Sequence, residues 1–284
     1  MLWFCWENRD IKMKRYRFTT FIIDSMRSSM RSLLKMPGAP SEDQRNQDID
    51  WLRSRYGELD FDSKLERYLE LDSPNITVVT EYYWVLNEAA DAYACAYFYP
   101  ALTSACCLGE RILNILILRL REYYRATQSY KKVWKKDSFQ NWDEAIDALA
   151  EWGVLDNALA ELYKELWTIR KDAIHLKAIS DFQPQALQAI LHILKITGNL
   201  FGLNERNDIF FWVPGEPYIR KEKEKEPIVQ EFFIPNCTLV GYKYSVRNGP
   251  RPGQFIYDDP YEYQDREITD DEFKKLRQSW RSKQ

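Results

Sequence analysis

The sequence predicts a mainly α-helical protein with a small β-rich region near its C-terminal end, α+β overall. Across residues 76–203, apolar side chains recur every three or four positions, which is typical of amphipathic helices. Beyond residue 204, short aromatic and β-branched runs alternate with Gly and Pro turns. We therefore expect a helical N-terminal extension (1–75), a helical bundle (76–203) and a β-rich C-terminal region (204–284).

The N-terminal region carries weak helical signals. Residues 22–34 predict a short helix, which the turn Pro37-Gly38-Ala39-Pro40 ends. A charged stretch covers residues 41–62, and the spacing of Leu65, Tyr68 and Leu69 predicts a second short helix. These features lead us to read residues 1–75 as a helical extension of the bundle.

The helical signals are stronger in the bundle region than in the N-terminal region. Pro100 suits the first turn of a long helix, Gly153 suits the end of a short one, and Asp156 or Asn157 can cap the next. That next helix carries a leucine-rich seam with a four-three spacing, which predicts packing along one face. The expected helices cover residues 77–96, 101–124, 143–152, 156–177 and 183–200. The seam residues are Leu155, Leu159, Leu162, Leu166, Ile169, Ala173 and Leu176.

The C-terminal region predicts strands at residues 209–213, 228–234 and 238–246. The alternating charges of residues 220–226 favour a solvated loop over a binding tract. Thr269 and Glu272 form a capping-box pattern that opens a last helix reaching Trp280.

Composition excludes several functional classes. The net charge of −3 argues against a chain that coats nucleic acid along its whole length. Residues 92–109 carry no charge, but Pro100 interrupts them, so we expect buried helices and no membrane contact. The chain has five cysteines and two histidines without metal-ligand spacing, so neither a metal site nor a cofactor is expected. Unpaired thiols favour a cytoplasmic location.

Phosphate-binding glycine loops and a serine nucleophile elbow are absent from the sequence. The remaining candidates for catalytic residues are Arg170 and His175, which lie late in the leucine-patterned helix. A guanidinium presents a planar fork of donors to phosphate, and an imidazole transfers protons near neutral pH. Together they are suited to metal-free cleavage of RNA, in which one group stabilises charge and the other moves a proton.

Helical geometry constrains this pair. A spacing of five residues places the two side chains about 140° apart around a straight helix. Convergence on one phosphate therefore requires a helix distorted near Asp172, or a two-fold dimer that brings two copies of each residue into one groove.

The Arg170–His175 spacing in this helix resembles the R-x(4–6)-H motif of the HEPN superfamily. The stretch Tyr99 to Leu113 is similar to the second long helix of that family, and the order of helices over residues 76–203 agrees. Lys171 stands where active members often carry a small polar residue directly after the arginine.

The resemblance implies a helical, commonly dimeric fold and a metal-independent endoribonuclease activity. Arg170 and His175 match the motif residues, and the expected product carries a 2′,3′-cyclic phosphate. The family setting implies toxin–antitoxin or antiviral defence, an RNA substrate, a homodimer, and an antitoxin such as a nucleotidyltransferase. Lys171 and Lys177 are candidates for binding the RNA backbone.

Alternative interpretations stay open for each feature. Arg170 could pair with Glu165 or Glu161 on its own helix, and His175 is a favourable cation at a helix C-terminus. Lys171 and Lys177 could equally be last-turn lysines, and His192 is expected to be a packing residue.

The basic and aromatic cluster at residues 123–136 suits single-stranded RNA or a solvated helix end. The whole bundle could instead be a non-catalytic dimerisation or adaptor module, or a nucleotide-binding regulator.

Overall fold

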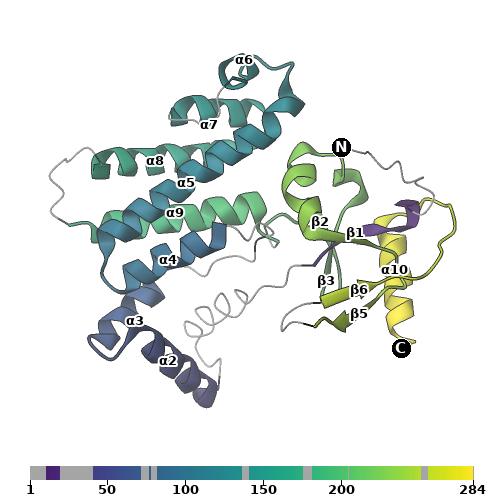
Figure 1. Cartoon of the computed structure of the whole chain (residues 1–284), viewed down its shortest axis with the longest axis horizontal. Coiled ribbons are helices and arrows are strands. Elements are labelled where there is room, and N and C mark those ends of the chain that lie inside the picture. Colours follow the sequence, from purple (N-terminus) through teal and green to yellow (C-terminus); the bar gives the residue numbers. More distant parts are fainter. Residues whose placement is uncertain are drawn as a thin grey trace. The chain divides into compact units, whose positions relative to one another are not determined.

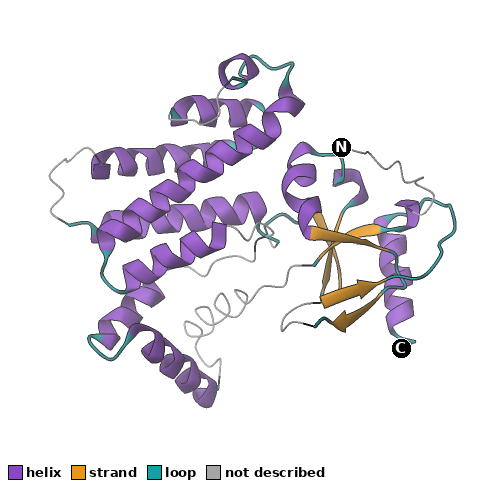
Figure 2. Cartoon of the chain, in the orientation of Figure 1, coloured by secondary structure: helices purple, strands orange, loops and turns teal. Residues whose placement is uncertain are grey.

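The computed structural model describes residues 11–19, 41–71, 77, 82–135, 141–174, 181–203, 205–250 and 255–283. The chain divides into two compact units. One contains residues 24–205 and is helical; the other joins residues 1–23 to residues 206–284 around a small antiparallel sheet (Figures 1 and 2). The predicted fold class, mainly α and α+β overall, is confirmed.

In the helical unit, long helices lie side by side around a shared core (Figure 1). The helix α5 contacts α4, α7, α8 and α9. The described helices are α2 (Glu42–Tyr56), α3 (Phe61–Glu70), α4 (Tyr83–Ala94), α5 (Phe98–Leu120), α6 (Tyr130–Val133), α7 (Trp142–Glu151), α8 (Asn157–Ile174) and α9 (Gln183–Phe201), with the 3₁₀ turn η3 (Arg121–Tyr124) after α5.

Local signals explain where these helices begin and end. The Asp156 carboxylate accepts a hydrogen bond of 2.8 Å from the Leu159 amide and so caps α8 as one of the two predicted residues. Gly153, the second residue after the end of α7, adopts a φ of 70°, a conformation that favours glycine. Of the predicted seam residues on α8, Leu159, Leu166 and Ala173 are buried, whereas Leu162 and Ile169 are partly exposed.

Within the described part of the chain, one helix, Phe98–Tyr124, is long and apolar enough to cross a membrane by length and composition alone. However, 56 % of its most apolar window is buried inside the protein. The core helix of a folded bundle has the same composition, and α5 packs against α4, α7, α8 and α9.

The structure differs from the sequence prediction in the N-terminal region. Residues 15–18 form strand β1 of the second unit, although we predicted a helical extension there. The charged stretch contains α2, which begins with a Ser41 cap and packs through Leu52 against α3 and α4. The helix expected at residues 22–34 lies outside the described residues. Strand β1 was not recognised because it is only four residues long, and because two of its buried residues, Arg15 and Arg17, are charged.

The sheet of the second unit has the strand order β2-β3-β1-β4, and all its pairs are antiparallel. Two further strands, β5 and β6, pair with each other, and the helix α10 covers one face of the four-stranded sheet. The strands are β1 (Arg15–Phe18), β2 (Phe210–Val213), β3 (Glu216–Ile219), β4 (Cys237–Val240), β5 (Ser245–Asn248) and β6 (Phe255–Asp258), and α10 is Asp270–Arg281. The short turns are η1 (Ile11–Met13), η4 (Lys221–Lys223) and η6 (Ile234–Asn236).

Two strand predictions in this region were wrong. Residues 229–233 form the π-helical turn η5, because Ile228, Val229, Phe232 and Phe233 recur at helical spacing and all face the core. The strand expected at residues 238–246 is divided into the end of β4 and the start of β5, with a turn at residues 242–243 directly after Gly241. A Cβ atom at Gly241 would lie 2.0 Å from the Tyr263 ring, so a larger residue at this position would require the Tyr263 ring to move.

An ionic network is buried between the sheet and α10. The Arg277 guanidinium, 4 % exposed, donates to both oxygens of Glu216 at 2.9 Å and to the Tyr244 carbonyl at 2.7 Å. The Tyr218 hydroxyl donates to Glu216 at 2.6 Å. Burial would raise the pKa of Glu216, but the hydrogen bonds from Arg277 and Tyr218 lower it to about 2. This network joins β3 to α10 across the core of the unit.

Candidate functional site

Arg170 lies on α8, one turn before the last described residue of that helix, Ile174. Its side chain is 23 % exposed, so the guanidinium lies at the surface of the bundle while its stem is covered. The Nε atom is buried and makes no hydrogen bond within the described ranges of the chain. This position leaves the guanidinium accessible to a ligand from one side.

The partner of Arg170 is Glu110 on α5. The Nη2 atom of Arg170 lies 2.9 Å from Oε2 of Glu110, and the carboxylate is 24 % exposed. The pairing with Glu165 or Glu161 that we considered is not observed: Glu165 contacts His192 at 2.9 Å, and Glu161 contacts Lys164 at 3.2 Å. A pair between two helices fixes the guanidinium more firmly than a pair along one exposed helix face, because both helices belong to the core.

Two tryptophan rings lie beneath the Arg170 guanidinium. Trp142 of α7 and Trp167 of α8 stack with their centroids 5.3 Å apart, and the Arg170 Cζ atom is 5.3 Å from the Trp167 centroid and 6.0 Å from that of Trp142. Cation–π attraction at such distances restricts the guanidinium without using its donors. The arginine therefore keeps hydrogen-bonding capacity while its position is set.

Lys171 lies beside the same ring, since its Nζ atom is 5.4 Å from the Trp167 centroid. Arg170 and Lys171 thus bring two positive charges to one patch with one carboxylate, Glu110. The other two predicted site residues, His175 and Lys177, lie outside the described residues. Convergence of Arg170 and His175 is therefore a prediction that stays open.

A close approach of α5 to α8 places Glu110 next to Arg170. Gly109 precedes Glu110 on α5, and a Cβ atom at this glycine would lie 2.5 Å from Cδ2 of Leu166 and 3.3 Å from the Trp142 ring. Leu166 is completely buried and Trp142 is 1 % exposed, so neither has free space to move into. The absence of a side chain at Gly109 is what allows the two helices to meet here.

We expect Gly109→Ala to destabilise the helical unit by about 1–2 kcal/mol, despite the better helix propensity of alanine. Urea unfolding followed by far-UV circular dichroism measures this change. Ser104→Ala on the same helix is the matched control and should change stability by less than about 0.5 kcal/mol. A Gly109→Ala protein as stable as the wild type would show that Leu166 can repack and that the close approach is not required.

Other ionisable side chains near the site have different roles. Burial raises the pKa of the Cys106 thiol to about 12, so this cysteine is neutral and unsuited to nucleophilic attack at neutral pH. His192 on α9 was expected to be a packing histidine with its polar atoms satisfied; its side chain is 13 % exposed, and its Nε2 atom lies 2.9 Å from Glu165. Burial lowers the pKa of His192, although the Glu165 charge opposes that shift.

Sequence reasoning missed Glu110, Trp142 and Trp167 as neighbours of Arg170. A signal for Glu110 was present, since it is an acidic residue directly after a glycine in a long apolar helix. For the tryptophans no signal was available, because an aromatic residue in a helical pattern is more often a core residue than part of a site.

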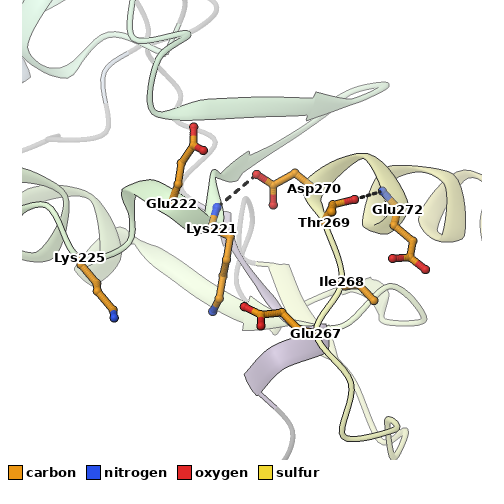
Figure 3. A pocket seen from close by; sticks show the side chains of 8 residues that line it. All are labelled: Lys221, Glu222, Lys225, Glu267, Ile268, Thr269, Asp270 and Glu272. Atoms are coloured by element: carbon orange, nitrogen blue, oxygen red, sulfur yellow. Dashed lines mark hydrogen bonds between the residues drawn. The ribbon is translucent and has the colours of Figure 1, made fainter.

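A pocket of about 650 Å³ lies in the second unit at the N-terminus of α10 (Figure 3). Its charged lining consists of Lys221, Lys225, Glu222, Glu267, Asp270 and Glu272. The Asp270 carboxylate already accepts a hydrogen bond from the Lys221 amide, and Thr269 caps the Glu272 amide (Figure 3). Since carboxylates occupy the positive end of the helix, this pocket does not favour a phosphate.

Within the described ranges, no group of three or more His, Cys, Asp or Glu residues could hold a metal ion. No family model, curated protein or solved structure matches this chain significantly. The candidate site is therefore defined by its own geometry: a cationic patch at the surface of a helical bundle, built on Arg170.

Proposed function

We propose that this protein is a HEPN-type, metal-independent endoribonuclease. The observation that supports this proposal is the position of Arg170. This arginine lies on the motif helix, and a carboxylate and two stacked indole rings hold its guanidinium in place. A purely structural surface arginine does not require such support, whereas a group that must meet a phosphate in one orientation does. Accessibility on one side and restraint on the other suit an electrostatic catalyst.

In the proposed reaction, the ribose 2′-hydroxyl loses its proton as its oxygen attacks phosphorus. The bond to the 5′-oxygen of the following nucleotide breaks, and that oxygen gains a proton. The products are a 2′,3′-cyclic phosphate and a 5′-hydroxyl. His175 acts in one of these proton transfers, and Arg170 stabilises the charge that develops on the phosphoryl oxygens. Lys171 and Lys177 bind the neighbouring backbone phosphates.

The proposed assembly is a homodimer in which two motif helices share one groove. A second His175 in that groove would allow one imidazole to accept a proton while the other donates one. Toxin–antitoxin or antiviral defence in the cytoplasm, with an antitoxin such as a nucleotidyltransferase, is the proposed setting.

Incubation of labelled single-stranded RNA with the full chain in EDTA tests this proposal. We expect cleavage in EDTA, with 2′,3′-cyclic phosphate ends, and loss of cleavage in both Arg170→Ala and His175→Ala. Variants that cut as well as the wild type would exclude the proposed site. Cleavage by the wild type that stops in EDTA and returns with added magnesium would exclude the metal-independent mechanism.

A non-catalytic dimerisation or adaptor module is the second candidate, and the Glu110 contact favours it. A carboxylate 2.9 Å from the Arg170 guanidinium partly neutralises the charge that a phosphate would need. Overexpression in growing cells separates the two candidates. A ribonuclease slows growth and His175→Ala relieves the effect, whereas an adaptor gives equal growth with either protein.

A further inference from the structure

A short, strongly basic segment follows α5 in the helical unit. Residues 121–135 carry five basic residues and one acidic residue, although the whole chain has a net charge of −3. The segment contains η3, the turn at residues 125–129, and α6. Its positive charge is therefore local and comes from a stretch of chain that reverses direction on the bundle.

The segment is attached firmly to the C-terminal end of α7. The Glu151 carboxylate accepts hydrogen bonds from the amides of Gln128 at 3.2 Å and Ser129 at 3.0 Å. Trp152 donates from its indole nitrogen to the Thr127 hydroxyl at 3.0 Å, and its ring stacks on Tyr124 with centroids 4.8 Å apart. A solvated helix end would not need these contacts, which hold the backbone in one conformation.

Two aromatic rings are presented to solvent from this rigid segment. Tyr123 is 49 % exposed and Trp134 is 45 % exposed. The Lys135 Nζ atom lies 4.7 Å from the Trp134 centroid, and Lys131 and Lys132 on α6 are exposed. Exposed rings next to several cations match the chemistry of single-stranded nucleic acid, whose bases stack and whose phosphates are negative.

We propose that this segment, which we call the 121–135 platform, binds single-stranded RNA. Bases stack on Trp134 and Tyr123, and Lys131, Lys132 and Lys135 neutralise backbone phosphates. This inference rests on the proposed function, since it names the strand that the Arg170 site would cut.

The helix α7 connects the Arg170 site to the 121–135 platform. It begins at Trp142, which lies beneath Arg170, and ends at Glu151, which anchors the platform. Ten helical residues span about 15 Å, a distance that a few nucleotides of single strand can cross. The platform would therefore hold a strand whose continuation reaches the Arg170 site.

Fluorescence anisotropy with labelled 2′-O-methyl oligouridine, which cannot form a cyclic phosphate, tests this binding separately from cleavage. We expect Trp134→Ala to weaken binding by about 5- to 150-fold, because one stacked base contributes about 1–3 kcal/mol. Trp134→Phe should retain most of the affinity. The double variant Lys131→Ala/Lys132→Ala should reduce the slope of log K against log salt by about 1.4. The matched controls Trp212→Ala and Lys275→Ala, in the second unit, should bind like the wild type.

Two outcomes would overturn the platform. In the first, the Trp134→Ala protein and the double-lysine variant both bind like the wild type. In the second, only the double-lysine variant loses binding, which indicates that the segment binds a negatively charged partner without base stacking. If the wild type binds RNA through Trp134 but does not cleave it, the nuclease proposal is rejected and the platform is retained. If the wild type cleaves RNA but its binding does not depend on Trp134, the platform alone is rejected.

Discussion

Arg170→Ala is expected to lower RNA cleavage by at least about 100-fold, because removal of one positioned donor from a charged transition state costs that much. Arg170→Lys should recover little of the loss, since an ammonium cannot reproduce the planar fork that lies over Trp167. The expected effect on stability is small: the Arg170–Glu110 pair is partly exposed, and such pairs contribute about 1 kcal/mol or less. Cleavage rates and urea unfolding of the same proteins measure the two effects.

Arg111→Ala is the matched control for this experiment. Arg111 follows Glu110 on α5 and is exposed, so its loss should leave cleavage and stability unchanged. If Arg111→Ala lowers cleavage as much as Arg170→Ala, positive charge on this surface matters in general and Arg170 has no specific role. If Arg170→Ala unfolds the helical unit, the contacts to Glu110 and the tryptophans are primarily structural.

Arg277→Met is expected to destabilise the sheet-containing unit by about 3–5 kcal/mol, because it leaves the Glu216 carboxylate buried without a partner. Hydrogen exchange followed by mass spectrometry resolves the two units. Amides of β3 and α10 should lose protection, while those of α5 and α9 should keep it. Lys275→Met on the exposed side of α10 is the control and should change little.

The double variant Glu216→Gln/Arg277→Met should recover part of this loss, since no buried charge remains without a partner. Equal protection in the double and single variants would show that the Arg277 contacts to the Tyr242 and Tyr244 carbonyls are the main contribution.

The contribution of Glu216 to the stability of the sheet-containing unit depends on pH with a defined sign. The folded-state pKa of Glu216, about 2, is below its ordinary value, so its ionic contribution is present above about pH 4.3. That stability is lost as the pH falls through about 2. In Arg277→Met the carboxylate has lost its main partner, and protonation relieves the cost of burial. The destabilisation measured at pH 7 should therefore be smaller at pH 4, and a difference that is the same at both values would contradict this account.

The residues of the candidate site were only partly predictable. The seam on α8 placed Arg170 at the edge of a buried face, and the structure agrees, because the spacing of Leu159 and Leu166 sets that face. Its partner was not predictable, since Glu110 is 60 positions away and the contact depends on the missing side chain of Gly109. Patterns within one segment report burial, whereas ion pairs between segments depend on how helices cross.

By itself, the sequence determined the helical bundle, the helix caps at Asp156 in α8 and Thr269 in α10, and the change to strands near residue 210, because periodicity and capping act within a few residues. Only the tertiary structure decided that β1 joins the sheet beside β3 and β4, and that Glu216 meets Arg277. Those pairings join residues up to about 225 positions apart in the sequence. Only the folded core decides which of the many possible partners are buried together.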